Sequence, residues 1–285
     1  EAVDRGDLLA LEAFGLRPVM VPDIGDSLDG HLVDAEYSAL TLGGTPRSEI
    51  LTLGESAATL VVGASLNKAA DLLKARSGVP DYRFRGLMGL DDCDAFTQAL
   101  AEISGNPVPD KIERHRAQLQ DAMVDSHFMI GFARVALAAD PDLLVMLSTF
   151  LLGMGAEIVS AVSPVRADSL AALPLRSITI GDLEDLEKEA RAKNAQLVVS
   201  NSHAVETANR LGLPLLRAGF PQYDWVGGYA RAWVGYRGTR QALFDLANLM
   251  LSQHHDIEPY RSQYWRDTPR APECSPPPAT GVVRH

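Results

Sequence analysis

The chain contains 285 residues, of which 46% are apolar and 22% charged; at about 100–200 residues per domain this length predicts two globular domains. The formal charge of −11 argues against nucleic acid or an anionic membrane as the main partner, because those partners require a basic face. The only cysteines, Cys93 and Cys274, argue against a disulfide scaffold and cannot supply the usual thiolate set of an iron–sulfur cluster. Residues 1–7 are polar and no apolar run reaches roughly 18 residues, which predicts a cytoplasmic protein.

The first half of the chain alternates helical and strand patterns. The leucines of residues 8–11, together with Phe14, predict a helix over 8–14 that ends at Gly15. Pro18–Val21 predicts a short buried strand. The β-branched run Thr59–Val62 is typical of a parallel strand. The other elements predicted here are helices over 46–53, 65–75 and 91–103 and a strand over 81–84.

A long polar helix follows Pro107 and Pro109. Residues 110–130 carry sparse apolar positions, which suit a partly exposed linker helix. Asp140 and Pro141 predict the N-cap and first residue of the next helix. The second half predicts strands over 134–137, 157–160, 177–180, 196–199 and 215–217, helices that begin near 141, 182 and 202, and a last helix over 239–251.

This alternation predicts an α/β fold with parallel-sheet domains joined by a long helix. We expect one α/β domain over 1–130, which includes the linker helix 110–130, and a C-terminal α/β domain over 131–262. The remaining residues, 263–285, are rich in proline and are predicted to form a loose tail.

Two turns between a strand and a helix could offer backbone amides to an anion, namely Val62–Asn67 and Ser200–His203. Neither contains the glycine fingerprint of a phosphate loop. The alternative is that Ser or Asn side chains cap these helices, which is a common way for a helix to begin. The sequence favours capping.

Residues that could bind a metal are scattered, and none forms a zinc-type constellation such as H-E-x-x-H. The G-x-S-x-G elbow and C-x-x-C pair of covalent chemistry are also missing from the sequence. We therefore predict no catalytic, cofactor-binding or metal-binding residue in this chain. The groups considered are His254–His255, His203 with Glu206, Asp125 with His127, and Asp91–Asp94 around Cys93.

The most unusual segment is Leu215–Gly238, which holds two Trp, three Tyr, one Phe, three Arg and five Gly in 24 residues. It follows a predicted strand, and loops at the carboxyl ends of parallel strands commonly carry function in α/β proteins. Aromatic residues and arginine are also enriched at protein interfaces. The segment is predicted either to cover the sheet edge or to contact a partner.

Within this segment, Gly219–Asp224 reads Gly-Phe-Pro-Gln-Tyr-Asp and Gly235–Gly238 reads Gly-Tyr-Arg-Gly. The pair resembles the C-terminal signature of the nitrogenase component 1 family, in which G-F-P-x-[FY]-D precedes a G-Y-x-G turn into the last long helix. The resemblance extends from about residue 30 to residue 251. Five further segments resemble the branch of the family that forms the scaffold for maturation of the iron–molybdenum cofactor: 116–129, 153–157, 161–164, 181–185 and 201–203.

The resemblance implies two Rossmann-like α/β domains that correspond to the second and third domains of such a subunit. The first domain, whose cysteine helps to hold a [4Fe–4S] cluster at the subunit interface, is then expected to be missing. Neither Cys93 nor Cys274 matches a ligand position of the family. The resemblance therefore implies no cofactor on this chain, whereas the whole complex is expected to carry [4Fe–4S] clusters and a cofactor precursor.

The resemblance also implies a non-catalytic scaffold subunit that pairs with a NifE-like subunit in a heterotetramer. The Fe protein and the cluster donor NifB are expected as transient partners, and nucleic acid and membrane are not. Two alternatives stay open: the β-type subunit of nitrogenase itself, and an unrelated enzyme that binds a nucleotide sugar between two Rossmann-like domains. The residues predicted to contact a partner or to brace the loop are Arg231, Trp233, Arg237, Asn201 and His203.

Overall fold

The computed structural model describes residues 10–23, 44–228 and 231–252. The chain divides into a large unit, Glu1–Gln253, and a second unit, His254–His285. The predicted tail over 263–285, the His254–His255 pair and Cys274 lie outside the described residues. The predicted limits of the two α/β domains stay a prediction.

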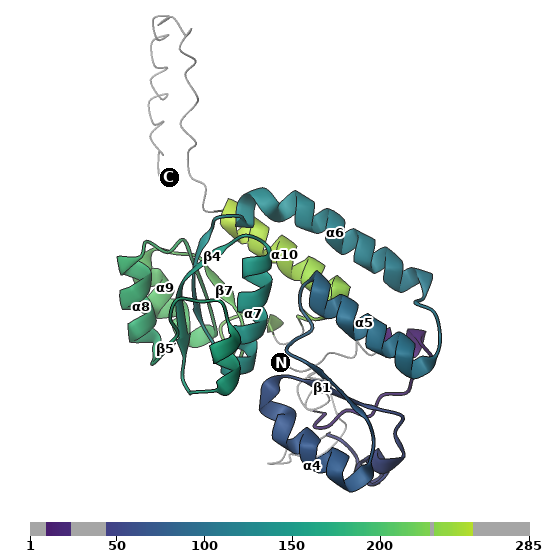
Figure 1. Ribbon diagram of the computed structural model, residues 1–285. Helices are drawn as coiled ribbons and strands as arrows, with labels where there is room; N and C mark the ends of the chain where they lie inside the picture. The colour runs from purple at the N-terminus through teal and green to yellow at the C-terminus, as the bar shows by residue number, and fades with distance from the viewer. Residues whose placement is uncertain (1–9, 24–43, 229–230, 253–285) are drawn as a thin grey trace, which may run out of the picture. The chain divides into compact units, whose positions relative to one another are not determined.

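The described strands form two parallel sheets (Figure 1). A two-stranded sheet pairs β1 with β2, and a five-stranded sheet has the order β5-β4-β3-β6-β7, with every neighbouring pair parallel. The predicted α/β class with parallel sheets is therefore confirmed. The strands are β1 (Thr59–Val62), β2 (Asp81–Phe84), β3 (Arg134–Ala138), β4 (Glu157–Ser163), β5 (Thr179–Ile180), β6 (Leu197–Ser200) and β7 (Leu215–Arg217).

Helices connect these strands, as right-handed crossovers between parallel strands require. Most match the predicted positions to within a few residues, but the last helix begins at Gly235, one turn before the predicted Thr239. This earlier start places Arg237 on the helix. The helices are α3 (Arg47–Leu51), α4 (Asn67–Ser77), α5 (Leu90–Ser104), α6 (Asp110–Ile130), α7 (Pro141–Gly153), α8 (Leu183–Ala192), α9 (Val205–Leu211) and α10 (Gly235–Leu251), with short 3-10 turns at Leu53–Glu55, Ala64–Leu66, Asp168–Ala172 and Ser202–Ala204.

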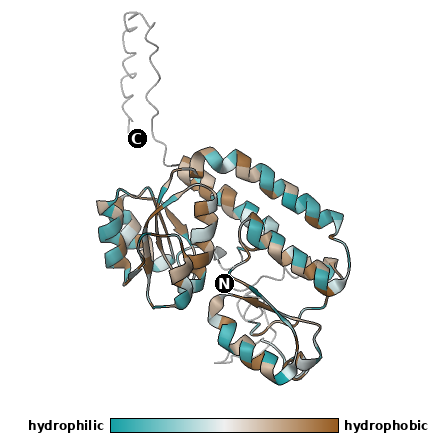
Figure 2. Ribbon diagram, viewed as in Figure 1, coloured by the Kyte–Doolittle hydropathy of each residue, from teal (hydrophilic) through white to brown (hydrophobic). Residues whose placement is uncertain are grey.

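The central strands of the larger sheet are buried on both faces, and Figure 2 shows that they are mainly hydrophobic. Successive side chains of a strand point to opposite faces. Accordingly, Val135 and Leu137 of β3 join one apolar cluster, with residues of α6, α7 and α10, whereas Ala136 joins another with residues of α8 and α9. This double burial explains why these strands are continuous apolar runs in the sequence.

The predicted linker helix α6 packs along α10 (Figure 1). Ile112, Leu119 and Ile130 are buried on one face of α6, while Val124 and Phe128 are exposed on another. Phe14 and Met250, near the two ends of the described chain, belong to the same apolar cluster as these α6 residues.

One local prediction is wrong. Residues 18–21 form no strand, and Pro18 at the start of the segment and Pro22 after it have no amide donors for a sheet ladder. Asp140 is the N-cap residue of α7 and Pro141 occupies its first turn, as predicted, but the Asp140 side chain makes no capping hydrogen bond. The backbone carbonyl of Asp140 accepts from the amide of Leu144 at 2.8 Å, which is the first hydrogen bond of the helix.

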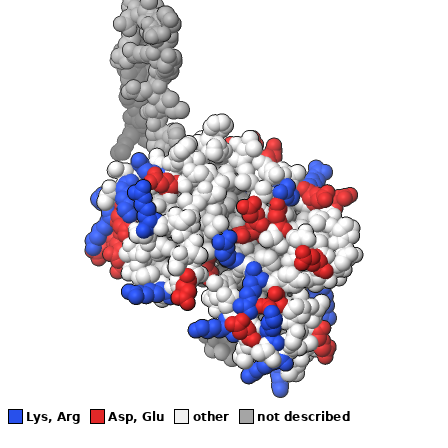
Figure 3. Space-filling view, in the orientation of Figure 1, with Lys and Arg blue, Asp and Glu red and all other residues white. Residues whose placement is uncertain are grey.

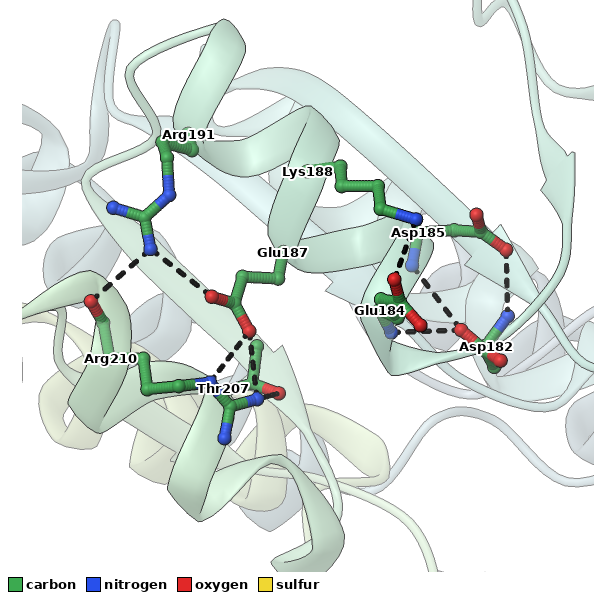
Figure 4. A network of polar contacts seen from close by, with 8 residues as sticks. All are labelled: Asp182, Glu184, Asp185, Glu187, Lys188, Arg191, Thr207 and Arg210. Carbon is green, nitrogen blue, oxygen red and sulfur yellow. Dashed lines mark hydrogen bonds and ion pairs between the residues drawn. The ribbon is translucent and has the colours of Figure 1, made fainter.

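Polar contacts fix α8 against α9 on the outer face of the larger sheet (Figure 4). Asp182 and Asp185 form a reciprocal capping box at the start of α8. Glu187 pairs with Arg191 at 3.1 Å and with Arg210 of α9 at 2.7 Å.

On the face drawn in Figure 3, basic and acidic side chains are interspersed. None of the described helices has both the length and the hydropathy that a membrane span needs.

Candidate functional site

The unusual aromatic segment begins at the carboxyl edge of the larger sheet. Ser200 at the end of β6 lies opposite Arg217 at the end of β7, so the turn after β6 and the loop after β7 emerge side by side. The amide of Ser202 donates to the carbonyl of Pro221 at 3.0 Å, and the amide of Ala218 donates to the carbonyl of Ser200 at 2.9 Å. The register of the parallel strands therefore positions this site.

Asp224 anchors the loop to both strand ends. Its Oδ2 accepts from Arg217 Nε at 2.8 Å and from Nη2 at 2.5 Å, and its Oδ1 accepts from the hydroxyl of Ser202. The hydroxyl oxygen of Ser202 in turn accepts from the amide of Tyr223 at 3.1 Å. The Arg217 guanidinium, together with the Ser202 hydroxyl, lowers the pKa of Asp224 to about 2. Asp224 therefore carries its charge throughout the neutral pH range.

Asn201 closes the turn after β6. Its Oδ1 accepts from the amide of His203 at 3.1 Å, and its Nδ2 donates to the carbonyl of Phe220 at 2.7 Å. The His203 ring stands edge-on to Tyr223, and the Tyr223 hydroxyl lies 3.4 Å from His203 Nδ1. The structure thus confirms the capping interpretation of this turn. It also places both predicted residues, Asn201 and His203, in contact with the loop after β7.

The other candidate anion cradle, after β1, is filled from elsewhere in the chain. Oδ1 of Asp142 on α7 accepts from the amide of Ala64 at 3.1 Å, and its Oδ2 accepts from the amide of Ser65 at 3.1 Å. The expectation that Ser or Asn caps this turn is wrong, because the cap is an aspartate 77 residues away in the sequence. Gly63 makes this approach possible: it has φ +98°, and an added Cβ would lie 2.6 Å from Asp142 Oδ2.

Arg231, Trp233 and Arg237, the other predicted residues of the segment, occupy three different environments. Trp233 is buried at 4% exposure, and its indole Nε1 has no hydrogen-bond partner among the described residues. Arg231 is exposed, pairs with Asp245 of α10 at 3.3 Å and lies 5.2 Å from the ring centre of Trp225. Arg237 lies on α10, where it lines a cavity. A role for these residues in contacting a partner stays a prediction.

Two guanidinium groups contact the ring of Trp225. Arg217 lies 4.8 Å from its ring centre on the strand side, and Arg231 contributes the second contact. Both distances fall within the range of cation–π attraction. Trp225 nevertheless remains 43% exposed, and the loop also exposes Phe220 at 53% and Tyr223 at 68%. The segment therefore presents aromatic surface to solvent from a fixed base.

Metal-ligating residues do not converge in the part of the chain that the structure describes: no group of three or more His, Cys, Asp or Glu side chains is placed to hold an ion. Cys93 is buried at 2% exposure, and its Sγ lies 3.5 Å from the carbonyl of Leu87. A cluster ligated by this thiol at a subunit interface would require Cys93 to leave the core. The geometry of Cys93 therefore does not fit an interfacial iron–sulfur ligand.

The sequence profile of a family described as nitrogenase component 1 type oxidoreductase matches residues 8–251. The chain is 41% identical over 271 residues to the nitrogenase iron–molybdenum cofactor biosynthesis protein NifN of Bradyrhizobium diazoefficiens, covering 95% of this chain and 58% of that protein. It is 46% identical over 254 residues to NifN of a Nostoc species, covering 88% and 56%. The chain belongs to the nitrogenase component 1 family.

A solved structure agrees with this placement in the nitrogenase component 1 family. The chain matches a structure titled nitrogenase Cp1 at pH 6.5 with a TM-score of 0.83 and 28% identity, covering 92% of this chain and 60% of that chain. The predicted family fold is therefore confirmed, and the alternative of an unrelated nucleotide-sugar enzyme is wrong. The chain spans a little over half the length of the curated relatives that it matches.

Sequence reasoning assigned no role to Asp142 or Trp225, and it placed Ser202 in a candidate turn without predicting its partner. Asp142 and Ser202 act through contacts distant in sequence, which no local pattern reveals. Trp225 was part of the aromatic segment, but composition could not distinguish the exposed Trp225 from the buried Trp233. The Arg-rich, Gly-rich character of the segment was the one available signal.

Proposed function

We propose that this chain is the corresponding part of a structural subunit of the scaffold on which the nitrogenase iron–molybdenum cofactor matures. One observation carries the proposal: relatives at 41–46% identity over 88–95% of the chain are named for the biosynthesis of that cofactor. The solved nitrogenase chain is more distant, at 28% identity. This difference favours the scaffold branch over the β-type subunit of nitrogenase.

The partner in this proposal is a NifE-like subunit in a cytoplasmic heterotetramer. The loop after β7 supports a binding role, because Phe220, Tyr223, Trp225 and the fully exposed Val226 bring apolar surface together. Aromatic side chains with neighbouring arginines are typical of interface centres. Contacts with Asn201 and Arg217 hold the loop at its base, which lowers the entropy lost on binding.

The proposed role is non-catalytic. The two turns at the carboxyl ends of β1 and β6 present no open amide cradle, because Asp142 and Asn201 already accept from their amides. The [4Fe–4S] clusters and the cofactor precursor are assigned to the complex outside the residues described here, consistent with the buried position of Cys93. The Fe protein and NifB are proposed as transient partners of that complex.

A genetic experiment tests the function. The gene that encodes this chain is introduced into a diazotroph that lacks its own NifN gene and, separately, into one that lacks the nitrogenase β subunit. We expect restored acetylene reduction in the first strain and none in the second. The reverse pattern would establish the β-type alternative, and failure in both strains would overturn the scaffold role.

A binding experiment tests the loop. The chain is co-expressed with a tagged NifE-like subunit, and co-purification is compared among wild type, Trp225→Ser with Tyr223→Ser, and Phe128→Ser. Phe128 on α6 is a matched control, because its ring is 89% exposed and distant in sequence from the loop. We expect the loop variant to lose at least tenfold in recovered partner while Phe128→Ser binds normally. Equal binding by all three would remove the loop from the interface.

A further inference from the structure

A cavity of about 290 Å³ lies among α5, α6, α10 and residues 10–14, and the site after β7 does not include it. One part of its wall is apolar and includes Phe14, Phe96, Ile112 and Val234. Ligand pockets range from about 300 to 1,000 Å³, so this cavity suits a compact molecule. Its apolar wall favours a ligand with a small hydrocarbon part.

Four other lining residues are basic: Lys111 and His115 of α6 and Arg237 and Arg240 of α10. Among the described residues that line the cavity, none is an aspartate or glutamate. Arg240 donates to the amide oxygen of Gln118 at 2.5 Å, which leaves its charge uncompensated. Within the described part of the chain, Lys111 and Arg237 have no ion-pair partner. Four basic side chains therefore line one small cavity, with no carboxylate among its described lining residues.

Asp94 of α5 contacts Tyr236, a lining residue of the cavity, but its carboxylate is already paired. Asp94 Oδ2 accepts from Arg116 Nη2 at 2.7 Å, and its Oδ1 accepts from the hydroxyl of Tyr236 at 2.7 Å. These contacts tie α5 to α6 and α10 and fix the cavity wall. They also direct the Asp94 charge to Arg116, so Asp94 does not neutralise the basic residues of the cavity.

Gathering like charges costs free energy, and the effect is visible at His115. Burial, followed by Arg237, Lys111 and Arg240, lowers the pKa of His115. Each of these cations opposes a further positive charge in the cavity. An anion held among them would remove this repulsion, as anions do at arginine clusters generally.

We propose that this cavity binds a small organic anion, in which a phosphate or carboxylate contacts Lys111, Arg237 and Arg240 and a compact apolar part packs against Phe96 and Val234. Gly235 and Tyr236, at the start of α10, also line the cavity, and a helix N-terminus favours an anion. The site is formed by residues of this chain alone and does not depend on the proposed scaffold role.

Calorimetric titration of the full chain with phenyl phosphate and with inorganic phosphate tests the proposal. We expect one molecule of phenyl phosphate to bind at least tenfold more tightly than inorganic phosphate, because only phenyl phosphate uses the apolar wall. Lys111→Gln and Arg237→Gln are each expected to weaken phenyl phosphate about tenfold, since each removes a charged contact. Both side chains are exposed, so these variants should fold.

Lys68→Gln on α4 is the matched control, because it removes one exposed cation outside the cavity. Lys68→Gln should bind phenyl phosphate as tightly as wild type does. In both proteins the NMR resonance of the His115 imidazole should shift when phenyl phosphate binds. Thermal melts of all variants confirm folding. Equal binding by wild type and both cavity variants, no binding at millimolar phenyl phosphate, or equal affinity for the two phosphates would each overturn the proposal.

Discussion

The turns after β1 and β6 differ from the cavity beside α10 in how their polar groups are satisfied. At the turns, Asp142 and Asn201 already accept from the exposed amides, and Asp224 is paired with Arg217. In the cavity, Lys111 and Arg237 line a hollow that has no carboxylate among its described lining residues. Polar groups that pair within the chain stabilise the fold, whereas cations that line a cavity together are suited to bind an anion.

The largest expected effect concerns the filled turn after β1. Gly63→Ala places a Cβ 2.6 Å from Asp142 Oδ2 at φ +98°, so either the carboxylate withdraws or the backbone rearranges. We expect a loss of about 2–3 kcal/mol in the free energy of unfolding, from backbone strain and the weakened cap. Urea unfolding followed by circular dichroism measures it.

Gly153→Ala is the matched control for this change. Gly153 ends α7, and an added Cβ there would meet nothing within 4 Å. We expect its stability to stay within about 1 kcal/mol of wild type, with alanine favoured by helix propensity. Equal losses in the two variants would show that Asp142 does not determine the turn after β1.

The sequence predicted most of the fold because its signals are local. The apolar runs of β3 and β6 and the Pro141 helix start depend on neighbouring residues and reappear in the structure. The strand predicted at Pro18–Val21 failed because a strand also needs an available neighbour and amide donors. The Gly-Tyr-Arg-Gly turn located the start of α10, but periodicity alone placed that start one turn late.

The site was less predictable, because its contacts join distant parts of the chain. Asp142 reaches a turn 77 residues away, and Tyr236 reaches Asp94 across 142 residues. The cavity beside α10 likewise combines Phe14, Lys111 and Arg237, which no spacing rule connects. Composition identified the aromatic segment but could not show that Trp233 enters the core.

The second prediction tests the anchor of the loop after β7. Because the folded-state pKa of Asp224 is about 2, below the usual aspartate value near 3.9, its charge stabilises the fold above about pH 4. That stabilisation is lost as the pH falls toward 2. Asp224→Asn should lower the free energy of unfolding by about 1–2 kcal/mol at pH 7, the range for a hydrogen-bonded charge.

Urea unfolding at several pH values between 7 and about 2 measures this difference. The difference in the free energy of unfolding between wild type and Asp224→Asn should decrease as the pH falls and nearly vanish at about pH 2. Asp121→Asn, on the exposed face of α6, controls for the loss of a surface carboxylate. A gap that stays constant with pH would mean that the Arg217 pair does not stabilise the charged form of Asp224.

The smallest expected effect tests, without any ligand, whether the basic residues of the cavity beside α10 interact electrostatically. The pKa of His115 lies below its usual value because of burial and of Arg237, Lys111, Arg240 and Arg114. Arg237→Gln removes the largest of these cationic contributions, so the pKa of His115 should rise while burial keeps it below that of an exposed histidine. Proton–carbon NMR across pH follows the imidazole, and Lys68→Gln should leave it unchanged. If the pKa of His115 were unchanged in Arg237→Gln, Arg237 and His115 would not interact electrostatically. The basic residues would then not act together on the cavity, and the argument for an anion site would lose this support.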